Sequence, residues 1–456
     1  MTLLTRPSLN RLAVPIFFEF LLGMLVALLG LWLAARHSDA AAGTLGVMQQ
    51  VQETVVVLFR VLAIGAGVVV TQLLGADRPL KAKATATSAL AVATWVGALA
   101  TVILWGFRHH ILAVLNAPPA VVALALPYLW LMAPALWLEG YNLTMAAVLR
   151  AHLRVRESLI ITVFMHLTHA GLALPLMSGF GGFEGWGLMG FIAAFFVSRG
   201  VGLALHVWLW QRRLAMHLVR ENWWRFRREL IVPVFKVGAP GASLEAVYRL
   251  GFMVSLSTAA TLGVQALATQ AYVLQMLKFI LLTSLAIGWA VEIMVGRLVG
   301  SGELTQADAV VRKAVRNGLL ASGSVALLAA ASAPWLLQVF TRDPAIIAAA
   351  QGLLWMSLAL ELARVFNLIV NGALRATNDG MFAASTAMVS LILVLGTGSY
   401  LLGHALGLPG IWLAYIADEA LRGGVLWWRW RQRGWLKHTR QWWVAQRRQD
   451  GGLRED

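Results

Sequence analysis

Long apolar stretches recur along the chain and constrain its fold more than any other feature. Residues 21–35, 89–107, 319–339 and 382–402, together with their flanks, form runs of roughly twenty residues or more. A helix of that length crosses about 30 Å of hydrocarbon. Only 13% of the residues are charged, whereas a soluble domain carries about a quarter. The sequence therefore predicts an all-α membrane protein with little chain left for a soluble domain.

Twelve membrane spans are predicted from these stretches and from the polar segments between them. They cover residues 11–35, 50–74, 87–108, 122–148, 157–178, 185–211, 232–257, 265–298, 314–339, 345–371, 382–403 and 408–430. Lysine and arginine gather after the even-numbered spans, in segments that begin at Arg78, Arg150, Arg212, Arg312 and Arg375. Because cytoplasmic loops are enriched in these cations, both termini are predicted to lie in the cytoplasm.

The excess of cations follows from the same topology. A net charge of +16 would suggest nucleic acid in a soluble chain, but here the cytoplasmic loops and the C-terminal tail carry the charge. The tail RWRQRGWLKHTRQWWVAQRRQ mixes arginine with tryptophan, which is typical of a helix that lies on anionic lipid headgroups. We therefore expect the lipid bilayer as a partner, and no nucleic acid.

One spacing relates the two halves of the chain. Pro15 and Pro240, Gly75 and Gly300, and Arg150 and Arg375 are each 225 residues apart (240 − 15, 300 − 75 and 375 − 150). The stretches GWGLMGF and GLPGIW repeat at a spacing of 220 (410 − 190 for their matching glycines). Two homologous halves of six helices explain this repeat. An even number of helices gives both halves the same orientation, so a substrate cavity is expected at their interface.

The predicted organisation has four parts. They are an N-terminal lobe (1–211), a basic cytoplasmic linker (212–230), a C-terminal lobe (231–431) and a basic cytoplasmic tail (432–456). Gly75 and Gly300 are expected to cap helices. Arg150 and Arg375 are expected in the cytoplasmic headgroup zone, in contact with phosphates or helix C-termini.

Five segments of the chain resemble the MATE (multidrug and toxic compound extrusion) family. They are PIFFEFLLGMLV, IGAGVVVTQLLGADRPLKA, LLTSLAIGWAVEIMVGRLVGSGELTQA, NGALRATNDGMF and LGLPGIWLAYIADEALRGG, and they are distributed along nearly the whole chain in the family's order. The resemblance implies two six-helix lobes that face a central cleft. It also implies exchange of a proton or a sodium ion for a drug-like, often cationic, organic compound. We further expect a monomer in a bacterial cytoplasmic membrane.

The sequence departs from the family pattern in the first half. Many members carry an aspartate about fifteen residues after the first-helix proline, where this chain has Gly30. The fifth-helix region, often asparagine-bearing, here carries His166 and His169. Since both expected oxygen donors are missing, a sodium site at these positions is not expected. In the second half, Glu292 stands where glutamine is common.

Two glutamates follow helix prolines at nearly equivalent places in the repeat. Glu19 comes four residues after Pro15, and Glu245 five residues after Pro240. The prolines are expected to kink their helices, and a carboxylate in a span costs roughly 3 kcal/mol unless it faces a cavity or a partner. A carboxyl group withdrawn from water is able to exchange a proton near neutral pH. Glu245, and secondly Glu19, are therefore predicted to couple cation movement to transport.

Both glutamates have a structural alternative. Glu245 can form an ion pair with Arg249, one helical turn later, which would hold it charged. Glu19 can lie at the cytoplasmic interface. The predicted substrate contacts are Gln270, Tyr272, Gln275, Lys278, Glu292, Arg249, Asn367 and Asn371. Each of these side chains can instead form a hydrogen bond between helices.

No chemistry of catalysis is indicated by the sequence. The chain has no cysteine, which excludes disulfides and thiol chemistry, and it lacks the motifs of a nucleophile elbow, a zinc helix or a P-loop. His166 and His169 are one turn apart but have no third ligand at helical spacing, so no metal site is predicted. A transporter without a cofactor is expected.

The sequence thus predicts a cation-coupled antiporter, with protons placed before sodium, that exports organic cations by alternating access. The alternative is a lipid-linked saccharide flippase of the same superfamily, for which Arg249, Lys278 and Arg364 would supply a basic cavity. A membrane enzyme would need a metal or nucleophile cluster. A channel would not need two lobes that each carry a carboxylate.

Overall fold

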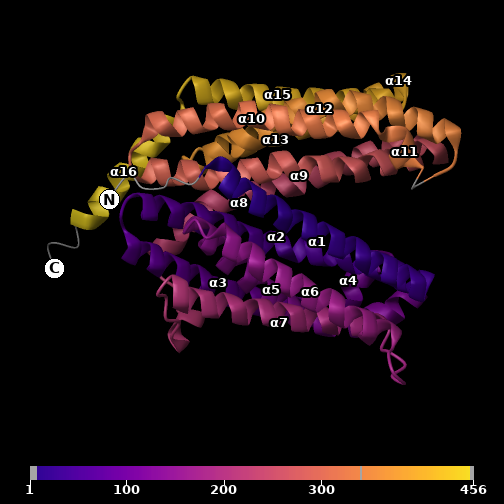
Figure 1. Cartoon of the computed structure of the whole chain (residues 1–456), viewed down its shortest axis with the longest axis horizontal. Helices are drawn as coiled ribbons and strands as arrows, with labels where there is room; N and C mark the ends of the chain where they lie inside the picture. The colour runs from indigo at the N-terminus through magenta and orange to yellow at the C-terminus, as the bar shows by residue number, and fades with distance from the viewer. Residues whose placement is uncertain (1–7, 339–340, 452–456) are drawn as a thin grey trace. The chain divides into compact units, whose positions relative to one another are not determined.

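The protein is built from helices along nearly its whole length, in a computed structural model that describes residues 8–338 and 341–451. The side chains of residues 242–246 and 448–451 lie outside the described part. The long helical spans are α1 (Leu9–His37), α2 (Asp39–Gly75), α3 (Pro79–Gly106), α5 (Pro119–Ala151), α6 (Val155–Ser178), α7 (Leu188–Arg213), α8 (Arg228–Thr261), α9 (Val264–Gly300), α10 (Leu304–Ala331), α12 (Pro344–Ala376), the consecutive α13 (Gly380–Ser390), η2 (Leu391–Gly396) and α14 (Thr397–Leu406), and α15 (Leu408–Arg431) (Figure 1). Shorter helices are α4 (Arg108–Val114), η1 (Arg220–Trp223), α11 (Ala333–Leu337) and α16 (Trp435–Gly451).

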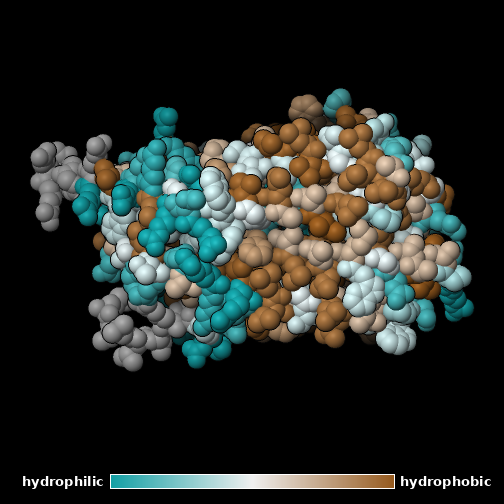
Figure 2. Space-filling view, turned by 90° about the horizontal axis from the view of Figure 1, so that it is seen from above, coloured by the Kyte–Doolittle hydropathy of each residue, from teal (hydrophilic) through white to brown (hydrophobic). Residues whose placement is uncertain are grey.

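The prediction of twelve spans in an all-α membrane protein is confirmed, because each predicted span falls on one of the long helical spans. Within the described residues, ten of them are long and apolar enough to cross a membrane by length and composition alone. The other two are α8 and α15, and α15 carries Asp418, Glu419 and Arg422 in its middle. Figure 2 shows hydrophobic side chains gathered over the middle of the helices, with hydrophilic side chains toward their ends.

The described chain divides into two compact units. The N-terminal unit comprises Phe18–Leu74 and Arg78–Ala239, and the C-terminal unit comprises the remaining described residues. The unit borders therefore lie inside α1 and α8 and on either side of Gly75–Asp77, at the C-terminal end of α2. The predicted lobe, linker and tail boundaries remain predictions.

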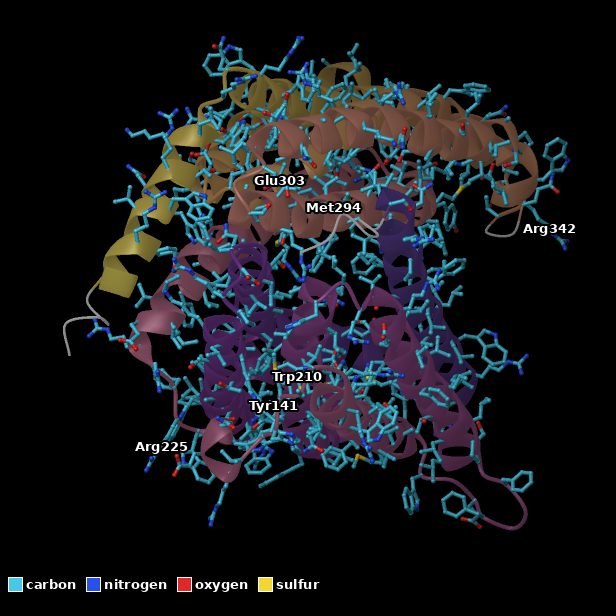
Figure 3. All side chains as sticks on the ribbon, turned by 60° about the vertical axis from the view of Figure 1, so that its left-hand side comes forward. Tyr141, Trp210, Arg225, Met294, Glu303 and Arg342 are labelled. Carbon is cyan, nitrogen blue, oxygen red and sulfur yellow. The ribbon has the colours of Figure 1, made fainter. Side chains whose placement is uncertain are left out.

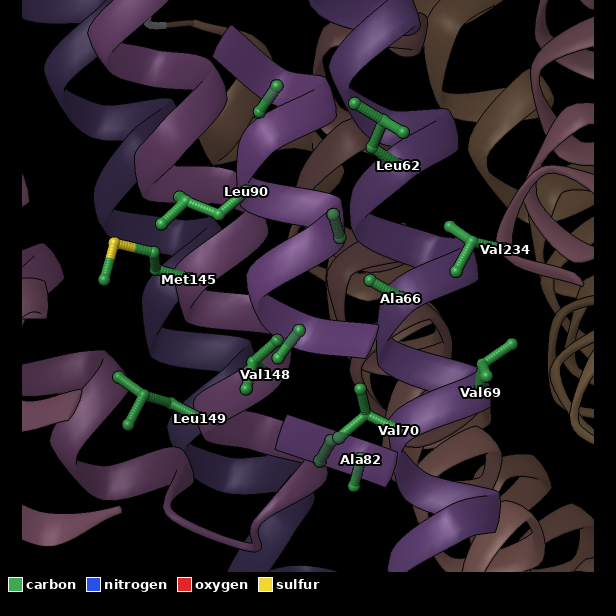
Figure 4. Close-up of a cluster of buried hydrophobic side chains, with 14 of the residues drawn as sticks. Leu62, Ala66, Val69, Val70, Ala82, Leu90, Met145, Val148, Leu149 and Val234 are labelled. Atoms are coloured by element: carbon green, nitrogen blue, oxygen red, sulfur yellow. The ribbon is translucent and has the colours of Figure 1, made fainter. Parts of the chain in front are cut away.

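Small and branched apolar side chains form the core of the N-terminal unit. Leu62, Ala66 and Val70 of α2 pack with residues of α3 and α5, among them Leu90 and Met145 (Figure 4). Helices in lipid associate through close packing more than through the hydrophobic effect, which favours small residues at their contacts. The alanines and valines of this cluster fit that requirement.

Glycines allow α2 and the start of α8 to approach each other closely within the N-terminal unit. A Cβ atom on Gly65 would overlap the carbonyl oxygen of Val234, and a Cβ atom on Gly238 would overlap that of Val61. The two backbones therefore touch at reciprocal positions, and neither glycine has room for a side chain.

The basic segment after α7 folds back onto α3 in the N-terminal unit. Lys83 donates a hydrogen bond through Nζ to the carbonyl oxygen of Ala215 (2.9 Å), and Trp95 donates through Nε1 to that of Trp224 (2.9 Å). Between the two segments lies a cavity of about 810 Å³, also lined by Arg225 (labelled in Figure 3). The segment is thus attached to the helices and is not a free tether.

The C-terminal unit has a core formed by α9, α10, α12 and α15. Gly288 of α9 and Gly372 of α12 meet closely, since a Cβ atom on Gly372 would lie 2.7 Å from the carbonyl oxygen of Gly288. Glu303, after α9, and Arg342, before α12, lie at opposite ends of this unit (Figure 3).

The predicted tail helix is present as α16, which is attached to the C-terminal unit. Trp435 stacks on Trp430 with ring centroids 4.6 Å apart, and Trp443 donates through Nε1 to the carbonyl oxygen of Val299 (3.2 Å). His438 lies 3.3 Å from Asp379. The tryptophans of the tail therefore hold the helix on the protein.

The close contact of α2 with α8 predicts a different effect of the same substitution at two glycines of α2. Gly65→Ala should lower the free energy of unfolding by about 1–3 kcal/mol, because the added methyl group meets a backbone carbonyl that must move. Gly46→Ala should be neutral or stabilising by up to about 1 kcal/mol, because alanine favours the helix and no described atom beyond the local helix backbone lies within 4 Å of the place that its Cβ would take. Thermal unfolding of the purified variants measures the difference, and equal effects at both sites would contradict the close contact.

Candidate functional site

Glu19 is held by an arginine from a distant part of the sequence. It lies on α1, four residues after Pro15, and is only 8% exposed. Nη1 of Arg150, in the last turn of α5, donates to Oε2 of Glu19 at 3.0 Å. The hydroxyl oxygen of Ser158 lies 3.5 Å from the same nitrogen. The structure therefore gives Arg150 a carboxylate partner, where lipid phosphates or helix C-termini were expected.

Arg375, the repeat equivalent of Arg150, also has a carboxylate partner. Its Nε and Nη2 donate to Oε2 of Glu292 on α9, at 2.9 and 2.5 Å. Glu292 is 6% exposed. The two halves thus place an arginine at the same position but neutralise it from different helices, α1 in the first half and α9 in the second.

A second buried ion pair joins α5 to α7 in the N-terminal unit. Nε of Arg199 lies 2.7 Å from Oε2 of Glu139. Asn142 donates through Nδ2 to the carbonyl oxygen of Arg199 (2.9 Å), and its Oδ1 lies 2.9 Å from Nδ1 of His206. These contacts close a polar layer between the two helices.

His166 and His169 lie beside this layer, and both are buried. The ring of His169 packs against those of Phe191 and Phe195, with centroids 4.8 and 5.5 Å apart. Phe191 also fills the space next to Gly30, where an added Cβ atom would lie 2.6 Å from the ring. A side chain at position 30 is therefore excluded unless Phe191 moves. Among the described residues, no group of three potential metal ligands is found.

The C-terminal unit contains a larger buried network of charges on α12 and α15. Arg364 donates to Glu361 through Nη1 and to Glu419 through Nε, the latter at 3.2 Å. Nη2 of Arg422 lies 2.5 Å from Asp418 and 3.2 Å from Glu419. Asn367 donates to Glu419 at 2.7 Å, and Ser390 of α13 donates to Asp418 at 2.6 Å. The five charged side chains are each at most 7% exposed.

The internal repeat relates the polar layer between α5 and α7 to the charge network of α12 and α15. At equivalent positions the acid and the base are interchanged. The spacing of 225 carries Glu139 onto Arg364 (364 − 139) and Asn142 onto Asn367 (367 − 142). The spacing of 220 carries Arg199 onto Glu419 (419 − 199). The acid–base pair between equivalent helices is therefore reversed in the second half. Arg199, Glu419 and Arg422 were missed as members of a site, although the repeat spacing of 220 relates Arg199 to Glu419.

Several of the predicted substrate residues form hydrogen bonds or ion pairs with other side chains. Gln270 donates to Ser255 at 3.1 Å and is buried, and Lys278 donates to the half-exposed Gln275 at 3.2 Å from an exposed position. Asn367 and Glu292 belong to the charge contacts above, and Asn371 accepts from Arg375 at 3.4 Å.

The remaining residues predicted for the site lie on α8 and α9. Tyr272 and Arg249 are half-buried. The side chain of Glu245 lies outside the described residues, so its pairing with Arg249 remains a prediction, as does the coupling role of either glutamate. Pro240 lies within α8, as Pro15 does within α1.

Comparison with curated proteins gives relatives along nearly the full length. An uncharacterized transporter of Bacillus subtilis, YisQ, is 27% identical, covering 94% of this chain and 95% of that protein. The probable multidrug resistance protein NorM of Thermotoga maritima is 23% identical, covering 91% of this chain and 90% of its own.

Solved structures share the fold. The Vibrio cholerae MATE transporter VcmN in its bent form superposes with a TM-score of 0.85 at 18% identity, covering 95% of this chain and 96% of that one. A MOP superfamily transporter from Pyrococcus furiosus gives a TM-score of 0.85 at 15% identity, covering 93% and 95%.

The family model MatE matches residues 15–174 and 244–401, which together make up most of the chain and fall in both repeat halves. The resemblance to MATE transporters inferred from the sequence is thereby confirmed. The protein belongs to the MatE family of multi-pass membrane transporters, which are not enzymes.

Proposed function

We propose that this protein is a proton-coupled antiporter that exports drug-like, often cationic, organic compounds by alternating access. The observation that carries the proposal is the carboxylate of Glu19, buried in the first helix and ion-paired with Arg150 at 3.0 Å. The other oxygen of Glu19, Oε1, is buried without a hydrogen-bond partner among the described residues. A carboxylate withdrawn from water in this way can exchange its partner for a proton.

The surroundings of Gly30, His166 and His169 in the N-terminal unit favour coupling to protons over coupling to sodium ions. Sodium, like other hard cations, is bound by several oxygen ligands. The space beside Gly30 is filled by Phe191, and the fifth-helix positions carry the imidazoles of His166 and His169. Nitrogen donors and an aromatic ring thus stand where oxygen ligands would be needed.

In the proposed mechanism, each half of the chain contributes one carboxylate that takes up and releases a proton. Protonation of Glu19 would remove the charge that holds Arg150, which leaves Ser158 as a neighbour of the guanidinium. Glu245, at the nearly equivalent place in the second half, is proposed as the principal coupling residue, with Arg249 as its partner in the unprotonated state. Protonation from the outside would release the substrate cation, and deprotonation toward the cytoplasm would restore its site.

The setting of the transporter belongs to the same proposal. The cations after even-numbered spans support a cytoplasmic location of both termini, in the cytoplasmic membrane of a bacterium, and a monomer is proposed as the working unit. The curated relatives named as probable multidrug resistance proteins support an organic substrate. They do not favour the saccharide flippase.

Removing the proposed proton carrier predicts loss of coupling. In inverted membrane vesicles with an imposed proton gradient, Glu245→Gln should abolish most of the uptake of a cationic dye, because glutamine cannot take up and release a proton. Glu157→Gln is the matched control, since Glu157 pairs with Arg154 at a half-exposed position. Sodium and proton gradients are imposed separately in the same vesicles. Undiminished proton-driven uptake by Glu245→Gln would contradict the assignment, and uptake driven only by sodium would contradict proton coupling.

The pairing of Glu19 with Arg150 predicts an asymmetric effect on stability. Glu19→Gln deprives a permanently charged guanidinium of its carboxylate and should lower the free energy of unfolding by about 3 kcal/mol or more. Arg150→Gln should cost less, because Glu19 can take up a proton and become neutral.

A double-mutant cycle measures the coupling between Glu19 and Arg150. In thermal unfolding, the variant that carries both Glu19→Gln and Arg150→Gln should be more stable than the sum of the single effects predicts, by about 1 kcal/mol or more. Additive effects would show that the ion pair contributes nothing to stability.

A further inference from the structure

We propose that the buried charge network of α12 and α15 binds one exchangeable proton, and that Glu361 is the carboxyl group that holds it. A second part of the proposal rests on the proposed function: this proton is one that the transporter exchanges for substrate. The two parts have separate tests.

The charges within the network are not balanced. The described residues in mutual contact are three carboxylates, Glu361, Asp418 and Glu419, and two guanidiniums, Arg364 and Arg422. Arginine stays charged in proteins. With every carboxylate ionised, the network would carry one negative charge at positions that are at most 7% exposed. One proton makes the network neutral, and an unbalanced buried charge is costly.

The three carboxylates of the network differ in their hydrogen bonds. Both oxygens of Asp418 are bonded, Oδ1 to Ser390 and Oδ2 to Arg422. Both oxygens of Glu419 are bonded as well, Oε1 to Arg364 and Oε2 to Asn367. Glu361 accepts from Arg364 with Oε1, but its Oε2 is buried without a partner in the described structure.

Protonation lowers the free energy most at a carboxylate oxygen that is buried in an apolar interior and accepts no hydrogen bond. A buried acceptor without a donor loses its hydration and regains nothing. Glu361 is 0% exposed, so water does not replace the missing donor at its surface. Protonation at Oε2 removes the unsatisfied negative charge, and release of the proton leaves the carboxylate with Arg364 as its single counter-ion.

The groups that face the network from neighbouring helices do not change this balance. Tyr248 of α8 and Tyr415 of α15 are its phenolic neighbours, and a phenol is neutral near pH 7. On α9, Glu292 pairs with Arg375, and Lys278 is exposed and donates to Gln275. On α8, Arg249 is half-buried, and its proposed partner Glu245 has a side chain outside the described residues.

The N-terminal unit serves as an internal comparison. Its equivalent layer contains one acid and one base, Glu139 and Arg199, at 2.7 Å, and it needs no proton for neutrality. The extra charges Glu361, Asp418 and Arg422 occur only in the second half. An excess carboxylate in this polar layer is therefore specific to the C-terminal unit.

The first test measures protonation directly. Infrared difference spectra of the full-length protein in nanodiscs, recorded during a pH titration, should show the carbonyl band of one buried protonated carboxyl group that disappears as the pH rises. Glu361→Gln should abolish this band. Glu53→Gln, which removes the half-exposed partner of Arg60, should leave it unchanged. A wild-type protein without the band, or a band that persists in Glu361→Gln, overturns the proposal.

Stability distinguishes the proposed proton site from an ordinary ion pair. Glu361→Gln mimics the protonated form and should keep the midpoint of thermal unfolding near that of the wild type at neutral pH. Glu419→Gln removes the acceptor shared by both arginines and should lower the midpoint clearly. If Glu361→Gln is as damaging as Glu419→Gln, Glu361 is needed as an anion and the proposal is wrong.

Transport decides the second part. Glu361→Gln should lose proton-driven dye uptake in inverted vesicles while it retains dye binding, measured by fluorescence polarisation of the purified protein. If the infrared band behaves as expected and Glu361→Gln transports like the wild type, the proton is bound but not exchanged, and only the second part fails. If the wild type shows no proton-driven uptake, the proposed function is wrong. The proton site at Glu361 is then judged by the infrared result alone.

Discussion

The cost of an unpaired charge in hydrocarbon determines how the helices of this protein are arranged. Each buried charged side chain described above lies next to an opposite charge, and most of these contacts join different helices: α1 to α5, α9 to α12, α5 to α7, and α12 to α15. Apolar packing alone would not choose among neighbours, because lipid tails are as apolar as leucine. The ion pairs restrict the choice, since a wrong neighbour would leave a guanidinium without its counter-charge. Close glycine contacts, such as Gly65 with Val234, then set how near the paired helices come.

The internal repeat shows how one scaffold carries two different electrostatic layers. The asparagines Asn142 and Asn367 occupy equivalent positions and bond to the neighbouring helix in both halves. The charged pair beside each asparagine is reversed, with the acid on α5 in the first half and on α15 in the second. If the acid and the base of a pair are interchanged together, the net charge of the pair stays zero. If only one of the two is replaced by the opposite charge, two like charges are left in contact. This constraint explains why both members of the ion pair differ between the halves, and not one member alone.

The span architecture could be predicted from the sequence because it depends on length, polarity and the distribution of cations along one dimension. The repeat and the family resemblance followed from the same linear information. The partner of Arg150 could not be predicted, since helical spacing relates residues within one helix and says nothing of which helix faces it. Glu19 was singled out as an intramembrane carboxylate and is buried in the structure, but its separation of 131 positions from Arg150 along the chain prevented prediction of the ion pair. Glu361 and Asp418 were missed as parts of one network for the same reason, although α12 and α15 each display their charges at helical spacing.

The absence of a side chain at Gly30 limits which residues can take part in the proposed mechanism. Phe191 occupies the adjacent space and packs on His169, so an acid could be restored there only if the aromatic cluster rearranged. The polar layer next to it already contains a permanent cation, Arg199, balanced by Glu139. A second cation in this layer would be repelled by Arg199, because the layer has no further acid to neutralise the added positive charge. Under the proposed proton antiport, the N-terminal unit is therefore restricted to Glu19 for exchange, and the excess carboxylate of the C-terminal unit supplies the remaining capacity for a coupling ion.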